Sequence, residues 1–170
     1  MNAAQIVRVF DQCFVQSHAT RLRGGGVEPL YLPGTETELA QLIFRADYAA
    51  SALHEIAHWC LAGYERRLQT DFGYRYIQPP RSVPEQARFY RLELRSQSLE
   101  WHFSQAAGVA FNVSTDNFAD DGNVAADILS LERTFSKQLS QQHEHTRNWL
   151  RTDGGRRAET FITALGQARG

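Results

Sequence analysis

Residues 52–63 read ALHEIAHWCLAG, and they carry a metal-binding pattern on a background of strong helix formers. His54 and His58 stand four positions apart in this stretch. On a helix of about 3.6 residues per turn, that spacing directs both imidazoles to one side, where they can hold a single ion. The HExxH pattern therefore predicts a helical metal site. The alternative is a chance match on an amphipathic surface helix.

Glu55 lies inside the same motif but faces a different direction from His54. It stands three positions before His58, so its carboxylate is expected beside the ion's water shell and not in the coordination sphere. A general base or an outer hydrogen-bond acceptor belongs in that position. Glu55 is thus the candidate catalytic residue.

Two histidines leave an ion undercoordinated, so a third ligand is expected from a separate element. No histidine follows at the short spacing of the long zinc-peptidase motif, which favours a downstream carboxylate. Glu93 and Glu100 are the first candidates, followed by Asp71 and His102. Glu93 lies in an apolar stretch where an unpaired carboxylate is costly to bury. Pairing with a neighbouring arginine at the surface would account for Glu93 equally well.

Two histidines and one carboxylate leave coordination positions open, and that arrangement serves two chemistries. With Zn²⁺, and with Glu55 as the base, bound water is activated for hydrolysis. With Fe²⁺, the same ligands leave room for dioxygen and support oxidation of carbon. The ligand types alone do not separate these alternatives.

The composition indicates which binding partners and which cellular compartment to expect. Among 170 residues, 18 are basic and 19 acidic, and the net charge of −1 implies no general attraction to nucleic acid or to membranes. No apolar run is long enough to span a bilayer, and no signal sequence precedes the first helix. Cys13 and Cys60 fit reduced thiols better than a disulfide framework. We expect one cytoplasmic domain over residues 1–170.

Apolar periodicity and capping residues predict a mainly helical chain with a few short strands. The expected strands cover 30–32 and 42–44, with a turn at Gly24–Gly26 and a β-prone stretch at 72–77. The expected helices cover residues 3–16, 47–69, 83–94 (after a capping box of Ser82 and Glu85), 96–107, a segment around 128–139 and one around 161–165. The fold class is α+β, with a small mixed sheet packed against the HExxH helix, a zincin-like site and additional C-terminal helices.

Other polar and aromatic groups have structural explanations. Arg66-Arg67 complements the negative end of the metal-binding helix. The two histidines of His143–His145 diverge on a helix, which predicts a solvated face. Trp59 and Trp101 are expected in the core or in a pocket wall.

The ordered series of motifs resembles the bacterial elongation factor P hydroxylases, most clearly over residues 5–117. The resemblance is carried by residues 48–63 (YAASALHEIAHWCLAG), Arg66-Arg67, Asp71–Tyr74, Gln97–Trp101, Ala106–Gly108, Phe111–Ser114 and Asp116-Asn117. It implies an oxygen-dependent, monooxygenase-type hydroxylase that acts on a lysine of elongation factor P already extended by β-lysine. The partner is therefore elongation factor P, with no direct contact to nucleic acid or membrane.

The same resemblance implies His54, His58 and Glu93 as the metal ligands. The implied cofactors are Fe²⁺, with Zn²⁺ possible in purified protein, and dioxygen. Glu55 then orients a ligand or relays a proton. A cationic lysine arm favours acidic wall residues, and the substrate-binding candidates are Asp71, Glu100, Asp116 and Asn117. The rival interpretations are a small cytoplasmic zinc peptidase and a non-catalytic, metal-stabilised binding module.

Overall fold

The computed structural model describes residues 1–74, 77, 80–115 and 126–170. In these residues the chain forms six α-helices, two short 3₁₀ turns and one three-stranded sheet. The helices are α1 (Ala3–His18), α2 (Ala49–Leu61), α3 (Tyr64–Arg67), α4 (Val83–Ala107), α5 (Ala126–Leu150) and α6 (Arg156–Arg169). The remaining elements are β1 (Thr20–Gly26), β2 (Leu30–Leu32), β3 (Ala40–Arg45), η1 (Thr70–Gly73) and η2 (Asp153–Gly155). The predicted α+β class is confirmed.

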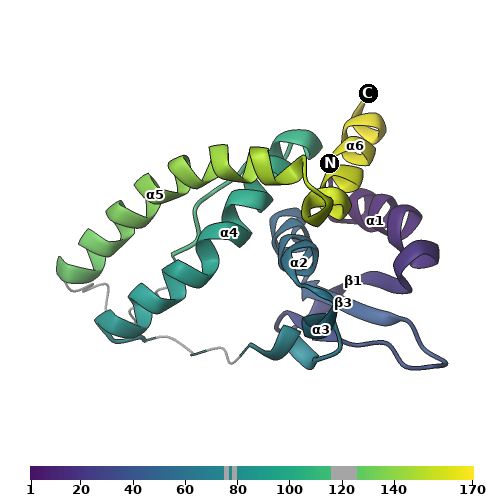
Figure 1. Ribbon diagram of the computed structural model, residues 1–170, viewed down its shortest axis with the longest axis horizontal. Helices are drawn as coiled ribbons and strands as arrows, with labels where there is room; N and C mark the ends of the chain where they lie inside the picture. Colours follow the sequence, from purple (N-terminus) through teal and green to yellow (C-terminus); the bar gives the residue numbers. More distant parts are fainter. Residues whose placement is uncertain (75–76, 78–79, 116–125) are drawn as a thin grey trace.

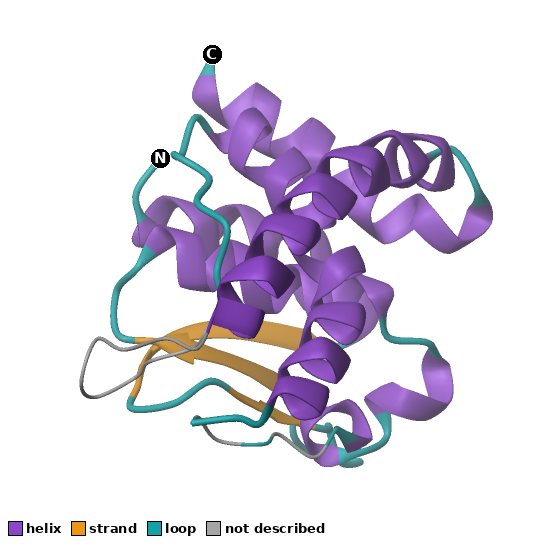
Figure 2. Ribbon diagram, turned by 90° about the vertical axis from the view of Figure 1, so that its left-hand side faces the viewer, coloured by secondary structure: helices purple, strands orange, loops and turns teal. Residues whose placement is uncertain are grey.

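The sheet is mixed and has β3 in its centre. β3 pairs with β1 in parallel and with β2 in antiparallel orientation. Alternation along β3 buries Ala40, Leu42 and Phe44 on one face, and α2 packs against this strand. Most of the helical mass lies on one side of the sheet (Figure 2). The predicted strand at 30–32 corresponds to β2, and the one predicted at 42–44 lies within β3.

The first strand runs through the glycines that were expected to form a turn. A Cβ atom at Gly24 would lie 2.8 Å from the ring of Phe44, and one at Gly26 would lie 2.9 Å from the side chain of Ile43. Gly25 has a φ of +89°, and the pairing with β3 shifts register between Arg23 and Gly26. The turn prediction is wrong because these glycines serve close packing and a bulge inside the strand.

Helix α4 begins and ends where the sequence predicts, but it has no break. The Ser82 and Glu85 capping box is present at its start. Gly108, with a φ of +64°, follows its last residue. The predicted second helix start at Ser96 is wrong, because Ser96 lies buried in the middle of one continuous helix.

Helix α2 is shorter than predicted, because it ends at Leu61 instead of near residue 69. Its terminal carbonyl groups accept hydrogen bonds from two arginine side chains. Arg67 donates to Ala62 O at 2.9 Å, and Arg157 of α6 donates to Ala62 O at 2.7 Å and to Cys60 O at 3.0 Å. These contacts fix the end of the helix and complement its negative dipole.

An aromatic cluster anchors α2 to α1 and α6. Trp59 is fully buried, with its ring centroid 5.3 Å from that of Phe10 and 4.8 Å from that of Phe14. Phe161 of α6 packs against the same two phenylalanine rings. Trp59 is thus a core residue, on the side of α2 away from the two motif histidines. Burial of these large rings stabilises the element that carries the predicted metal site.

Helices α4 and α5 lie side by side on the other flank of α2 and run in the same direction (Figure 1). The chain leaves α4 and runs back along it through residues 109–115 (Figure 1). None of the helices in the described ranges combines the length and apolar character of a bilayer-crossing segment. Cys13 and Cys60 are both free thiols.

Candidate metal centre

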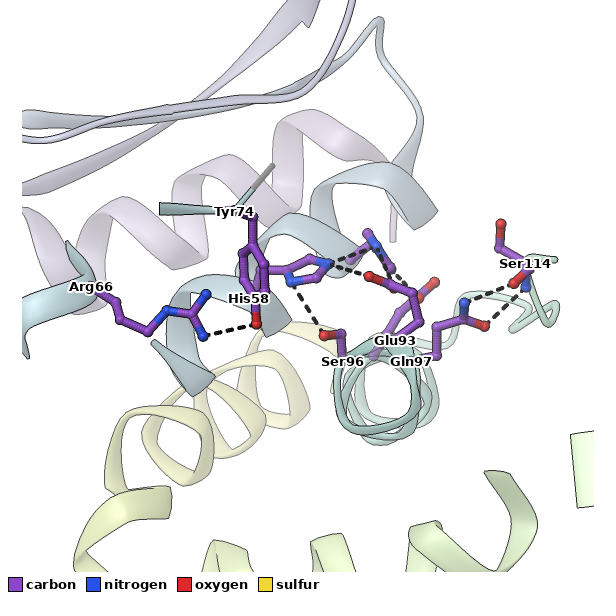
Figure 3. A network of polar contacts seen from close by, with 9 residues as sticks. His58, Arg66, Tyr74, Glu93, Ser96, Gln97 and Ser114 are labelled. Carbon is purple, nitrogen blue, oxygen red and sulfur yellow. Dashed lines mark hydrogen bonds and ion pairs between the residues drawn. The ribbon is translucent and has the colours of Figure 1, made fainter. Parts of the chain in front are cut away.

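Two helices meet at the motif histidines. Helix α2 presents His54 and His58 on one side, and α4 brings Glu93 against them. The three side chains are largely shielded, with exposed fractions of 23% for His54, 17% for His58 and 11% for Glu93. Figure 3 shows His58 and Glu93 pointing toward each other. Residues far apart in the sequence thus form one small cluster.

The donor atoms of this cluster have the spacing that a metal ion requires. The two Nε2 atoms of His54 and His58 are 3.0 Å apart, and each lies 3.4 Å from an oxygen of Glu93. Bonds of about 2.1 Å separate two ligand atoms by roughly 3.0 Å at a right angle and roughly 3.4 Å at a tetrahedral angle. Within the described residues, His54, His58 and Glu93 make up the cluster of three candidate ligands. These side chains fit a divalent metal.

The other ring nitrogen of each histidine has its own partner on α4. His54 Nδ1 lies 2.8 Å from the Glu100 carboxylate, and His58 Nδ1 lies 3.2 Å from the Ser96 hydroxyl. When Nδ1 carries the proton and donates it to these oxygens, the lone pair is on Nε2 and faces the cluster. Such partners set the tautomer and the ring orientation of metal-binding histidines.

The local electrostatics match an anionic metal cage. Burial works against a charged imidazole, but the hydrogen bond to Glu100 and the charges of Glu93 and Glu100 outweigh it and raise the pKa of His54 to about 10. Burial also works against a charged Glu93, but the charge and hydrogen bond of His58, with the charge of His54, lower its pKa to about 2. The carboxylate is therefore ionised and favours any cation between the two helices, whether a proton or a metal ion.

Glu55 lies beside the cluster without belonging to it. It is half-buried and makes no hydrogen bond or ion pair with any residue in the described ranges. Burial is the largest cause that raises its pKa, the charges of His54 and His58 oppose the rise, and those of Glu93 and Asp71 add to it. A carboxyl group with a raised pKa keeps its proton to a higher pH than an exposed glutamate does, which suits it to proton exchange.

The remaining candidates have different surroundings. Glu100 faces the far nitrogen of His54, whereas Glu93 faces both Nε2 atoms, so Glu93 is the better placed of the two for ligation. Asp71 accepts a hydrogen bond from Tyr31 N at 2.8 Å, and its charge helps to raise the pKa of Glu55. Asp116 and Asn117 are outside the described residues.

His102 does not join the cluster and stacks on His143 instead. The two ring centroids are 3.8 Å apart with an interplanar angle of 5°, and His102 Nε2 lies 3.1 Å from the His143 carbonyl oxygen. The solvated face predicted around His143 is wrong for this residue, which is buried between α4 and α5, and correct for exposed His145. Packing against the ring of Trp101 accounts for this burial.

The sequence analysis did not identify two neighbours of His58, which are the hydroxyl group of Ser96 and the ring of Tyr74. Glu93, Ser96 and Glu100 are spaced at i, i+3 and i+7, which places them on one helical face. That spacing could have revealed them, but the break predicted at Ser96 concealed it. Arg66 donates a hydrogen bond to the hydroxyl group of Tyr74 at 2.9 Å. The ring centroid of Tyr74 lies 6.2 Å from that of His58 (Figure 3).

Comparison with known proteins identifies the family of this chain. The sequence profile described as elongation factor P hydroxylase matches residues 9–169. The chain is also 45% identical, over 113 residues, to the elongation factor P lysine hydroxylase of Haemophilus influenzae. That alignment covers 66% of this chain and 64% of the relative, so it spans just under two thirds of the relative's length. Because the profile covers nearly all of the sequence, the chain belongs to the elongation factor P hydroxylase family.

Proposed function

We propose that this protein is a metal-dependent hydroxylase that adds one oxygen atom to the β-lysylated lysine of elongation factor P. The observation that carries the proposal is the convergence of His54 Nε2, His58 Nε2 and the Glu93 carboxylate between α2 and α4. Two histidines and one carboxylate are the ligand set of many non-haem iron oxygenases. Family membership and the name of the Haemophilus influenzae relative support a lysine of elongation factor P as the substrate, and its β-lysylated form is part of the proposal.

The proposed reaction is a monooxygenation. One atom of dioxygen enters a C–H bond of the substrate, and the other leaves as water after it receives two electrons from an external reductant and two protons. Fe²⁺ held by the three ligands would supply the dioxygen chemistry, and Zn²⁺ could occupy the same cage in purified protein. We propose that residues 1–170 form one domain. We also propose that it acts in the cytoplasm, because the proposed partner is a translation factor.

The protein's own side chains would prepare this chemistry. Glu100 and Ser96 hold the imidazoles so that both Nε2 atoms face one point. Glu55 would relay a proton at its carboxylate, since its pKa is raised and its oxygens are uncommitted in the described part of the chain. Asp71, with Asp116 and Asn117, remains a proposed substrate-side residue for a cationic lysine arm. Glu100 was also a candidate for that role, but its buried carboxylate is engaged by His54.

A zinc-dependent peptidase is the alternative use of an HExxH motif. In that reaction Glu55 would act as the base for a bound water, and neither dioxygen nor a reductant would be needed. The family match and the relative's name favour the hydroxylase instead.

The two functions are separated by the intact mass of elongation factor P purified from cells with and without the gene for this protein. Hydroxylation predicts a gain of one oxygen atom that is lost both on gene deletion and in a His54→Ala strain. Unchanged mass in the presence of the protein contradicts the proposal, as does peptide cleavage that depends on Glu55 and proceeds without oxygen.

A further inference from the structure

Gln97 has one of the most constrained side chains near the candidate metal centre. It is 1% exposed and lies one helical turn after Glu93 on α4. Its Nε2 donates to Ser114 O at 2.8 Å, and its Oε1 accepts from Ser114 N at 3.0 Å (Figure 3). Both bonds go to the backbone, so the hydroxyl group of Ser114 takes no part.

This double contact fixes which way the amide group of Gln97 points. A side-chain amide has one acceptor oxygen and a nitrogen with two donor hydrogens. Ser114 offers one acceptor and one donor, so only one orientation of the amide satisfies both. That orientation leaves the second N–H of Gln97 available for a further acceptor.

Glu93 is the acceptor that lies within reach. Positions 93 and 97 are four apart on a continuous helix, so their side chains share one face. The Gln97 amide is among the groups that lower the pKa of Glu93, after the charges and hydrogen bond of the two histidines. The same carboxylate faces His54 and His58 with its oxygens. The helix spacing thus places the amide of Gln97 beside the third candidate ligand, while Glu100 and Ser96 bond to the two histidines.

We infer that Gln97 is a positioning residue of the metal centre. Its amide, fixed by two hydrogen bonds to the backbone of Ser114, holds the Glu93 carboxylate in place. The inference rests on the proposed metal site and adds a third orienting group to it. It also makes segment 112–115, of which residues 112–114 are exposed, part of the support of a buried candidate ligand. Displacement of Ser114 would release the amide and, with it, one constraint on Glu93.

Gln86 allows this role to be separated from simple anchoring of the segment. It is fully buried on the same helix, and its Nε2 donates to Thr115 O at 2.9 Å. Gln86 and Gln97 therefore hold neighbouring residues of the same segment. No interaction links Gln86 to the candidate ligands in the described residues. A Gln86→Met variant loosens the segment and leaves Glu93 untouched.

The test is a Co²⁺ titration of the full chain, followed by absorption in the visible d–d bands, with circular dichroism to confirm folding. Gln97→Leu should weaken Co²⁺ binding roughly 10- to 100-fold, and both Gln97→Leu and Gln97→Glu should shift the band positions. The Glu variant is a near-isosteric check, since it retains an acceptor for Ser114 N–H but loses both donor hydrogens. Ser114→Ala preserves both backbone bonds and should bind as the wild type does.

Each outcome decides the inference. Wild-type affinity and spectrum in both Gln97 variants would overturn it, and so would an equal loss in Gln86→Met, which would assign the effect to the segment alone. A wild-type protein that takes up no Co²⁺ would contradict the metal site and this inference together. A protein that binds Co²⁺ yet leaves elongation factor P unmodified would contradict only the proposed function.

Discussion

The Glu100 carboxylate lies 2.8 Å from His54 Nδ1, on the opposite edge of the ring from the nitrogen that faces Glu93. The carboxylate is 7% exposed, so the contact is almost closed to water. This pair explains how a histidine on α2 can be held by α4 while its Nε2 stays available. It also explains why Glu100, at first a rival of Glu93 for the ion, is better suited to orient a ligand.

Loss of the Glu100 carboxylate should therefore weaken metal binding without removing a ligand. Glu100→Ala leaves His54 Nδ1 without its acceptor and should raise the dissociation constant for Zn²⁺ roughly 10- to 100-fold. Glu100→Gln keeps an acceptor oxygen but not the charge, so its effect should be smaller. Competition titration with a chromophoric chelator measures both values. Exposed Glu159→Gln is the control, and a loss of similar size there would contradict the assignment.

Metal binding should be coupled to proton release. The pKa of His54 is raised to about 10 in the metal-free protein, so this ring carries a proton at neutral pH that a metal must displace. Glu93, with a pKa lowered to about 2, is already ionised and releases none. The apparent affinity should rise about tenfold per pH unit between neutral pH and about 9, as expected for one proton. Calorimetric titrations in buffers of different ionisation enthalpy would count the proton, and affinity independent of pH would contradict the prediction.

The free energy of unfolding of the metal-free protein should fall as the pH rises above 6.5, whereas the metal affinity should rise. A pKa raised from 6.5 to about 10 means that His54 stabilises the fold fully below 6.5 and loses this contribution as the pH rises toward 10. A pKa lowered from 4.5 to about 2 means that Glu93 stabilises the fold fully above 4.5 and loses its contribution as the pH falls toward 2. Urea unfolding in the presence of a chelator should thus give a maximum between about 4.5 and 6.5 from these two groups.

His54→Gln provides the control for this pH profile. The variant lacks the titrating imidazole, so its unfolding free energy should fall less steeply between pH 6.5 and 10 than that of the wild type. Parallel profiles for the two proteins would show that other groups dominate.

The aromatic cluster behind α2 should dominate the stability of this part of the fold. Phe161 is fully buried and contacts the rings of Phe10, Phe14 and Phe103. Phe161→Ala should lower the unfolding free energy by about 3–5 kcal/mol. Exposed Thr163→Ala on the same helix should change it by no more than about 0.5 kcal/mol. Chemical denaturation measures both, and similar values for the two variants would contradict the packing assignment.

The sequence was informative where one local pattern carried the signal. The four-residue spacing of His54 and His58 predicted a shared helical face, and the Ser82 and Glu85 capping box marked the start of α4. It was misleading where long-range packing decided the structure. Gly24–Gly26 are typical of a turn, but here they allow the side chains of Phe44 and Ile43 to pack closely against the strand. Ser96 is typical of a helix cap, but its hydroxyl group instead contacts His58 of α2 from the middle of α4.

The choice between Glu93 and Glu100 shows the same limit. Both carboxylates lie in apolar surroundings seven residues apart, so spacing places them on one face of a helix without saying which meets the ion. The proposed choice of Glu93 depends on how α4 packs against α2, because Glu93 faces both Nε2 atoms and Glu100 does not. The placement of α4 against α2 depends on packing throughout the core, so the sequences of these two helices alone do not predict it.

The central claim is tested most directly by reconstitution with purified, β-lysylated elongation factor P. The Fe²⁺-loaded protein, a reductant and isotopically labelled dioxygen should give a product one labelled oxygen atom heavier, with the atom on the modified lysine in the fragment spectrum. His58→Ala and Glu93→Ala should abolish the product, whereas Glu159→Gln should not. An unlabelled oxygen atom, or no mass change with demonstrably metal-loaded wild-type protein, would contradict the account.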